Sequence, residues 1–282
     1  MVRRAVLIAA SVAAVSATIV LAKSNGQDWD SSAAAPSCEK NLLVNFEIDR
    51  DGQPVREVPI WQTSDGSAFF FVSGMTIDAD GAPNAYNADN TGLDDLSNAG
   101  EPGHWQGIVQ DQMGMPYIQG PDDPFPGFYV SCTSLVDRTK SVSDPHRYVD
   151  ASKIPYVVLP GGVARDGGAR VGDFVFVANL RNGTSTYAIF ADVGTLGEGS
   201  IALADRLGIH SDARIGGTRG GILYVIFPGS GDRTPHTADE INDQAGKQVA
   251  LWGGVDKLNA CATDSAATAP TVQPASVQQP AQ

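Results

Sequence analysis

The stretch that determines the fold runs from residue 171 to residue 209 and reads VGDFVFVANLRNGTSTYAIFADVGTLGEGSIALADRLGI. Its first apolar run, Phe174–Val177, predicts a strand, and Asn182-Gly183 is a dipeptide typical of a hairpin turn. The run Tyr187–Phe190 predicts the return strand. Ser200–Leu207 has apolar residues at helical spacing and is followed by a glycine, which favours a helix end. This stretch therefore predicts a β-hairpin followed by a short helix.

Two carboxylates in this stretch form a candidate catalytic pair. Asp192 follows the return strand of the hairpin, and Glu198 lies six residues later in a glycine-rich loop. Glycosidic hydrolysis needs two such groups, because one protonates the leaving oxygen while the other activates water or attacks carbon. The alternative is that Glu198 only complements the dipole at the start of the helix.

The remainder of the chain has the same strand-rich character. Ile154–Leu159 and Gly221–Phe227 predict further strands, and Ala238–Leu258 predicts one or two helices. Before residue 150, short apolar runs alternate with Gly, Pro, Asn and Asp, which indicates strands and long loops. We expect a mainly β, β-rich α+β domain over 38–262.

The charge distribution points to a cationic partner. The 282 residues carry 32 acidic and 19 basic side chains, a formal charge of −13 that argues against a nucleic-acid partner. The 81 residues between Arg56 and Arg138 hold 12 acids, no Lys or Arg, and 10 of the 21 aromatic residues. Carboxylates attract cations, and aromatic rings pack on the apolar faces of sugars. The alternative is that the rings form a core and the acids lie in solvated loops. The predicted substrate-binding residues are Asp78, Asp80, Asp94, Asp95, Tyr86 and Trp105.

Motifs for other chemistries are absent from the sequence. Asp49–Gly52 and Asp78–Gly81 resemble the start of a calcium loop, but Gly stands at the fourth position where the EF-hand needs it at the sixth. The chain has no Cys/His zinc pattern, no nucleophile elbow, no P-loop lysine and no dinucleotide fingerprint. We therefore expect neither a metal nor a cofactor.

The N-terminus has the pattern of an export signal. Arg3 and Arg4 precede the apolar run Ala5–Ala22, so we predict a signal peptide or anchor over 1–22, then a linker over 23–37. Residues 263–282 lack aromatic residues and predict a disordered tail. We expect a secreted or periplasmic protein without a membrane contact after signal cleavage. In that compartment two of the three cysteines (Cys38, Cys132 and Cys261) could form a disulfide, and the sequence leaves the pair open.

Several of these segments resemble glycoside hydrolase family 75, the chitosanases of fungi and bacteria. The matching segments are Ile154–Pro160, Gly172-Asp173, Tyr187–Gly194 and Gly197–Ala204, with weaker likeness over 78–95 and 119–134. The resemblance implies endo-hydrolysis of chitosan, the β-1,4-linked glucosamine polymer, with inversion and without a cofactor. It also implies that the essential Asp and Glu are Asp192 and Glu198, although five residues separate them here and fungal members have a longer loop.

The hairpin and helix are also similar to the later half of a double-psi β-barrel, as in expansins and rare lipoprotein A. This likeness implies a six-stranded double-psi-like β-barrel with long loops and a few short helices, and an open groove beside Asp192. We expect a monomer that hydrolyses chitosan or a related cationic polysaccharide. Two alternatives stay open at this point: an envelope enzyme that acts on the glycan of peptidoglycan, and a non-catalytic polysaccharide-binding protein.

Overall fold

The computed structural model describes residues 38–48 and 55–263, and these fall within one compact unit. The predicted signal peptide and linker, and all but the first residue of the predicted tail, lie outside the described residues. In the described ranges, none of the helices combines the length and the apolar character needed to cross a membrane.

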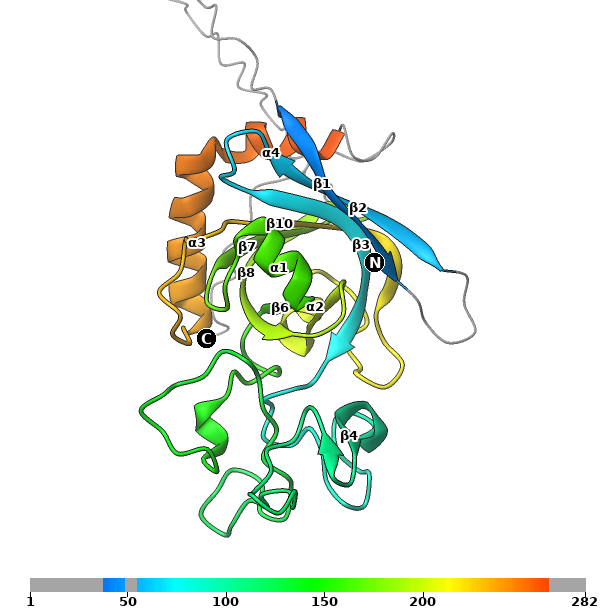
Figure 1. The fold of residues 1–282 in the computed structure, drawn as a ribbon, viewed down its shortest axis with the longest axis vertical. Helices are drawn as coiled ribbons and strands as arrows, with labels where there is room; N and C mark the ends of the chain where they lie inside the picture. The colour runs from blue at the N-terminus through cyan, green and yellow to red at the C-terminus, as the bar shows by residue number, and fades with distance from the viewer. Residues whose placement is uncertain (1–37, 49–54, 264–282) are drawn as a thin grey trace, which may run out of the picture. The chain divides into compact units, whose positions relative to one another are not determined.

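Six strands form a closed β-barrel, as predicted (Figure 1). In their order around the barrel, the strands are β3 (Phe69–Asp78), β10 (Thr218–Ile226), β7 (Phe174–Asn179), β8 (Thr184–Val193), β6 (Tyr156–Leu159) and β9 (Glu198–Ser200). The parallel pairing of β9 with β3 closes the barrel. β7 and β8 are the predicted hairpin, and Gly183 in their turn has φ +76°, a conformation that favours glycine.

The remaining elements extend and cover the barrel. An antiparallel pair, β1 (Lys40–Ile48) and β2 (Arg56–Thr63), continues the sheet beyond β3. The four helices of the described chain are short: α1 (Gly161–Gly167), α2 (Ile201–Arg206), α3 (Ala238–Trp252) and α4 (Gly254–Thr263). The predicted helix after Glu198 is α2, and Ser200 caps it by accepting a hydrogen bond from the Leu203 N–H.

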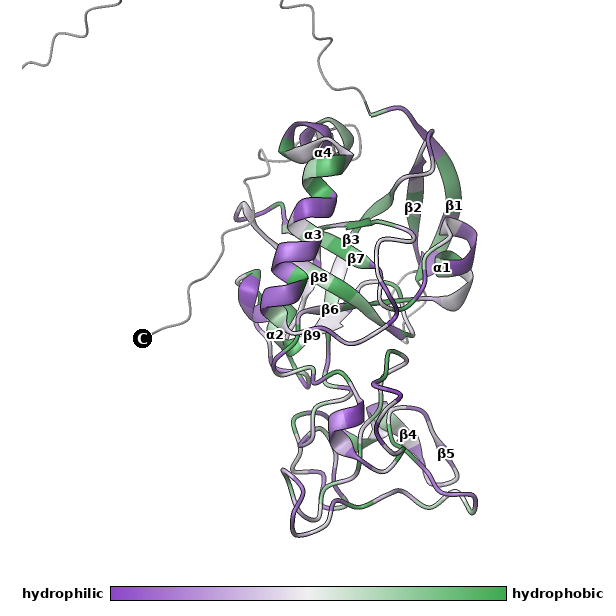
Figure 2. Ribbon diagram, turned by 90° about the vertical axis from the view of Figure 1, so that its left-hand side faces the viewer, coloured by the Kyte–Doolittle hydropathy of each residue, from purple (hydrophilic) through white to green (hydrophobic). Residues whose placement is uncertain are grey.

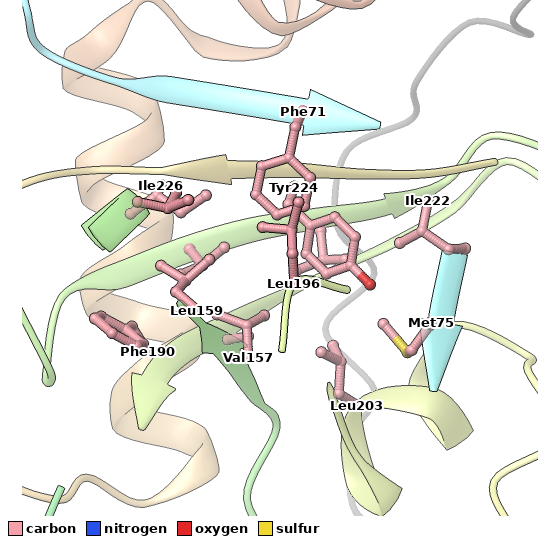
Figure 3. Packing of buried hydrophobic residues seen from close by; sticks show 14 of the residues in the cluster. Phe71, Met75, Val157, Leu159, Phe190, Leu196, Leu203, Ile222, Tyr224 and Ile226 are labelled. Carbon is pink, nitrogen blue, oxygen red and sulfur yellow. The ribbon is translucent and has the colours of Figure 1, made fainter. Parts of the chain in front are cut away.

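The barrel interior is filled by aliphatic and aromatic side chains (Figure 3). Phe71 of β3 and Tyr224 of β10 stack with ring centroids 4.8 Å apart. Val157 and Leu203 are fully buried in the same cluster, so the predicted strand over 154–159 and the predicted helix both contribute to this core. A packed interior means that a ligand binds at the barrel's surface and not inside it.

Helix α3 packs its apolar side on the outside of the barrel, and its polar side carries the charged residues (Figure 2). The buried residues Ile241, Ala245, Val249 and Trp252 recur at helical spacing. Trp252 packs edge-on against Phe227, with ring centroids 5.5 Å apart. A disulfide joins Cys38, just before β1, to Cys261 in α4, which resolves the pairing that the sequence left open and leaves Cys132 as a thiol.

The segment between β3 and β6 consists mainly of loops, cyan to green in Figure 1. It contains the short strands β4 (Gly100–Glu101) and β5 (His104–Trp105) and two 3-10 turns, η1 (Leu96–Ala99) and η2 (Pro145–Arg147). Backbone and side-chain hydrogen bonds attach it to the barrel: the Leu135 N–H donates to the Ala191 carbonyl, and the Tyr156 hydroxyl donates to the Asp80 carbonyl. These attachments hold the loops beside the ends of β3 and β8.

Candidate active site

The two predicted catalytic acids lie on either side of one residue of strand β6. Val158 pairs with Asp192 of β8 on one side and with Glu198 of β9 on the other. Asp192 and Glu198 are therefore two strand spacings apart, about 9.6 Å between Cα atoms at ~4.8 Å per spacing. The five residues between them in sequence leave β8, turn, and return as β9, which places both acids at the same level of the sheet.

These acids line a cleft of about 720 Å³ between the barrel and the loop segment. Six of the eight predicted site residues lie in its wall: Asp78, Asp80, Tyr86, Asp94, Asp192 and Glu198. Asp95 and Trp105 are not among the residues that line it. Asp78 and Glu198 meet because β3 runs parallel to β9, which sets Thr76 beside Glu198 and Asp78 beside Ser200.

Asp192 has one oxygen held by hydrogen bonds and one oxygen without them. Its Oδ1 accepts from the Ser134 N–H at 2.9 Å, the Ser134 hydroxyl at 2.6 Å and the Val193 N–H at 2.8 Å. Among the described residues no hydrogen bond to Oδ2 is found. Burial raises the pKa of Asp192, and the hydrogen bonds from Ser134 and Val193 oppose that rise. When the carboxyl is protonated, Oδ2 is the oxygen free to carry the proton.

Glu198 is fixed by the glycine-rich loop that precedes it. Its Oε2 accepts a hydrogen bond from the Thr195 N–H at 3.1 Å. A Cβ atom at Gly194 would lie 3.2 Å from that oxygen and 3.0 Å from Val158 Cγ1, so a larger residue there would press on the carboxylate. Gly197 has φ +80°, and a Cβ atom at that position would lie 2.9 Å from the Gly74 carbonyl oxygen. The local Gly pattern thus allows the chain to pass close to β3 and β6.

Asp78 and Asp80 form a second pair of acids in the same cleft. The Asp80 backbone N–H donates to Asp78 Oδ1 at 2.8 Å, which orients the Asp78 side chain. Burial, followed by the negative charge of Asp192, raises the pKa of Asp78 to about 8. Burial and the charge of Asp78 raise the pKa of Asp80 well above its ordinary value. The cleft therefore holds carboxyl groups that are protonated at neutral pH, which is the state a general acid needs.

Tyr86 is a buried residue whose hydroxyl group contacts two of the acids. Its hydroxyl donates to Asp80 Oδ1 at 2.7 Å and lies 3.4 Å from Asp94 Oδ2. The residue is 2% exposed, so little of its ring surface is accessible for the predicted stacking of a sugar. Asp94 is also buried, and burial raises its pKa, while hydrogen bonds from Asn98 and from the Asp95 N–H act in the opposite direction. The sequence could not distinguish a buried tyrosine in a polar network from an exposed one.

The two remaining predicted residues have structural contacts instead. Asp95 pairs with Arg214 at 2.6 Å, and Arg214 also donates to the carbonyls of Asn90, Gly92 and Asp94. Trp105 packs against Tyr129, with ring centroids 6.2 Å apart. Asp95 thus has an arginine as its counter-ion, and Trp105 has an aromatic neighbour in the loop segment.

Two residues of the cleft, Ser134 and Arg214, were not predicted from the sequence. Ser134 is an ordinary loop serine in sequence, yet it supplies two of the three donors to Asp192. Arg214 places a cation in the wall of an acidic cleft. No local pattern identifies either residue, because both act on groups 58 or more positions away.

In the part of the chain that the structure describes, no group of three or more His, Cys, Asp or Glu side chains could hold a metal ion.

Comparisons with known proteins add no family assignment. No protein-family model matches the chain, and no curated protein matches it significantly. The resemblance to glycoside hydrolase family 75 therefore stays a prediction.

Proposed function

We propose that this protein is an endo-chitosanase that hydrolyses β-1,4 glucosamine linkages with inversion. The observation that carries the proposal is the convergence of four carboxyl groups in one cleft: Asp78, Asp80, Asp192 and Glu198. Protonated and ionised carboxyl groups side by side are what glycosidic hydrolysis requires. Three of the four groups have pKa values raised by burial, so the protein maintains protonated acids where the cleft is open to solvent.

In this mechanism Asp192 is the proton donor and Glu198 is the base. Asp192 has a raised pKa and an Oδ2 that is available to donate its proton to the leaving oxygen. Glu198 orients a water for attack on the opposite face of the sugar. Strand spacing sets their Cα atoms about 9.6 Å apart. Inversion requires the carboxyl groups themselves to be roughly 6.5–9.5 Å apart, which leaves room for that water. No cofactor takes part in this chemistry.

The acidity of the cleft favours a polycationic substrate. Asp78, Asp80 and Asp94 lie in its wall close to the catalytic pair. An ammonium group that binds beside these carboxyls lowers their pKa values and becomes their counter-ion. The net charge of −13 adds a long-range attraction for cations. The predicted signal sequence and the Cys38–Cys261 disulfide support action outside the cytosol, where such polymers occur.

The test is release of reducing ends by residues 23–282 from three polymers: highly deacetylated chitosan, chitin and peptidoglycan. We expect product from chitosan, and little from chitin, because its acetylated nitrogens carry no charge. Product from peptidoglycan alone would support the envelope-enzyme alternative. Binding of chitosan without any product would support a non-catalytic binding protein, and either result would overturn the proposal.

A further inference from the structure

A cationic pocket adjoins the acidic cleft. It has a volume of about 260 Å³, and three arginines line it: Arg138, Arg170 and Arg233. Ser134 lines both this pocket and the acidic cleft, so the two adjoin at this residue, which also holds Asp192. Three exposed arginines around one pocket stand out on a chain with 19 basic and 32 acidic residues. A polycation alone would be repelled from this end of the groove.

The three guanidinium groups have no partners among the described residues. The carboxylates that precede two of these arginines in sequence bind other groups. Asp137, before Arg138, accepts hydrogen bonds from Thr139. Asp232, before Arg233, accepts from Thr234 and contacts His236. By comparison, Arg214 and Arg165 each form an ion pair. Unpaired arginines of this kind present planar forks of donors that fit an oxyanion.

The backbone holds the pocket in place. Buried Asp173 accepts hydrogen bonds from the N–H groups of Arg170, Gly229 and Gly231, and so joins the two loops that carry Arg170 and Arg233. These bonds also satisfy the Asp173 carboxylate, which therefore does not neutralise the arginines. Arg233 has φ +67°, an uncommon conformation for a non-glycine residue. A Cβ atom at Gly172 would lie 2.6 Å from Arg233 Cα, so the two loops are in close contact.

We propose that the arginine pocket, defined by Arg138, Arg170 and Arg233, binds an oxyanion substituent of the glycan that occupies the acidic cleft. The preferred substrate is then an amino-glycan that also carries carboxylates, and not a purely cationic polymer. This inference rests on the proposed function, because it places the amines of one polymer in the acidic cleft and its oxyanion in the pocket that adjoins the cleft. Amines bind beside Asp78 and Asp80, and the oxyanion binds beyond Ser134.

The test compares chitosan hexamer with carboxymethylated chitosan hexamer at constant ionic strength. Binding is measured calorimetrically with the Asp192→Asn variant, so that hydrolysis does not interfere. We expect about tenfold tighter binding of the carboxymethylated hexamer, and loss of that preference in Asp192→Asn combined with Arg170→Gln and Arg233→Gln. The exposed Arg219, on β10 and outside the pockets described here, provides the control: Arg219→Gln removes the same charge and should leave the preference unchanged.

Equal binding of the two hexamers would overturn the inference, as would an equal effect of Arg219→Gln. Binding of inorganic phosphate to the same variants is measured as well. If phosphate binds in an arginine-dependent way and carboxymethylation brings no gain, the pocket serves a free anion and the inference is wrong. The proposed function fails separately, when the wild-type protein cuts neither hexamer. An arginine-dependent preference in binding would then still support the oxyanion site.

Discussion

Burial raises the pKa of Asp78 far enough for its carboxyl group to stay protonated at neutral pH. In the folded protein its pKa is about 8, whereas the ordinary value is 3.8. Between these two pH values the folded state holds a proton that the unfolded chain has released. Folding stability therefore falls as the pH rises from about 4 to about 8, and the loss is complete above the folded pKa.

The corresponding prediction concerns Asp78→Asn, which keeps an oxygen for the Asp80 N–H and removes the ionisation. At pH 4 we expect little difference in the free energy of unfolding. At pH 8 the variant should be more stable than the wild type by several kcal/mol, at about 1.4 kcal/mol for each unit of the pKa difference, because no buried charge has to form. Urea unfolding at several pH values measures this. The exposed Asp89 serves as the control, and an Asp89→Asn variant with the same pH response would contradict the account.

At the scale of elements, the loop that contains Ser134 and the strand that contains Asp192 work together. The Leu135 N–H donates to the Ala191 carbonyl, so this loop pairs with the end of β8. That pairing places the Ser134 N–H and hydroxyl against Asp192 Oδ1. Ser134 is thus a positioning residue, which sets both the orientation and the protonation of the acid.

Ser134→Ala should lower kcat on chitosan about tenfold, the effect of one lost charge-assisted hydrogen bond. KM should change little. Because the lost bond favours the ionised form, the pKa of Asp192 should rise, and the alkaline limb of the pH–rate profile should move to higher pH. An unchanged pH profile would indicate a purely structural serine. Ser141→Ala, at an exposed serine of the same loop segment, is the matched control.

For the whole molecule, the disulfide connects the two ends of the described fold. Cys38 and Cys261 are 223 residues apart in sequence, and the bond joins the start of β1 to α4. Such a long loop restricts the unfolded chain strongly, with an effect on stability of roughly 2–5 kcal/mol.

We therefore expect the double variant Cys38→Ser and Cys261→Ser to melt several degrees below the wild type. A reducing agent should lower the wild-type melting temperature by a similar amount and should not affect the double variant. Cys132→Ser is the control, since this half-buried thiol is outside the disulfide and makes a hydrogen bond of 3.4 Å to the Gln106 carbonyl. The melting temperatures are measured by thermal unfolding monitored with circular dichroism. An equal loss in Cys132→Ser would contradict the role given to the disulfide.

Local patterns predicted the parts of this fold and not their assembly. The hairpin, the capped helix after Ser200 and the paired acids follow from residues close together in sequence. The closure of the barrel depends on β3 and β9, where Thr76 pairs with Glu198 over more than 100 residues. For that reason the sequence could list Asp78 and Asp80 as acids but could not place them beside Asp192. The sequence also could not predict which side chains are exposed, as the buried ring of Tyr86 shows.

The central claim is that Asp192 and Glu198 hydrolyse glucosamine linkages with inversion. The most direct measurement is proton NMR of the anomeric signals during early hydrolysis of chitosan hexamer, with the wild type, Asp192→Asn and Glu198→Gln. We expect the wild type to release the α-anomer first from the β-linkage. Both variants should release no product while their melting temperatures stay near the wild-type value. Early release of the β-anomer, or product from either variant, would contradict the central claim.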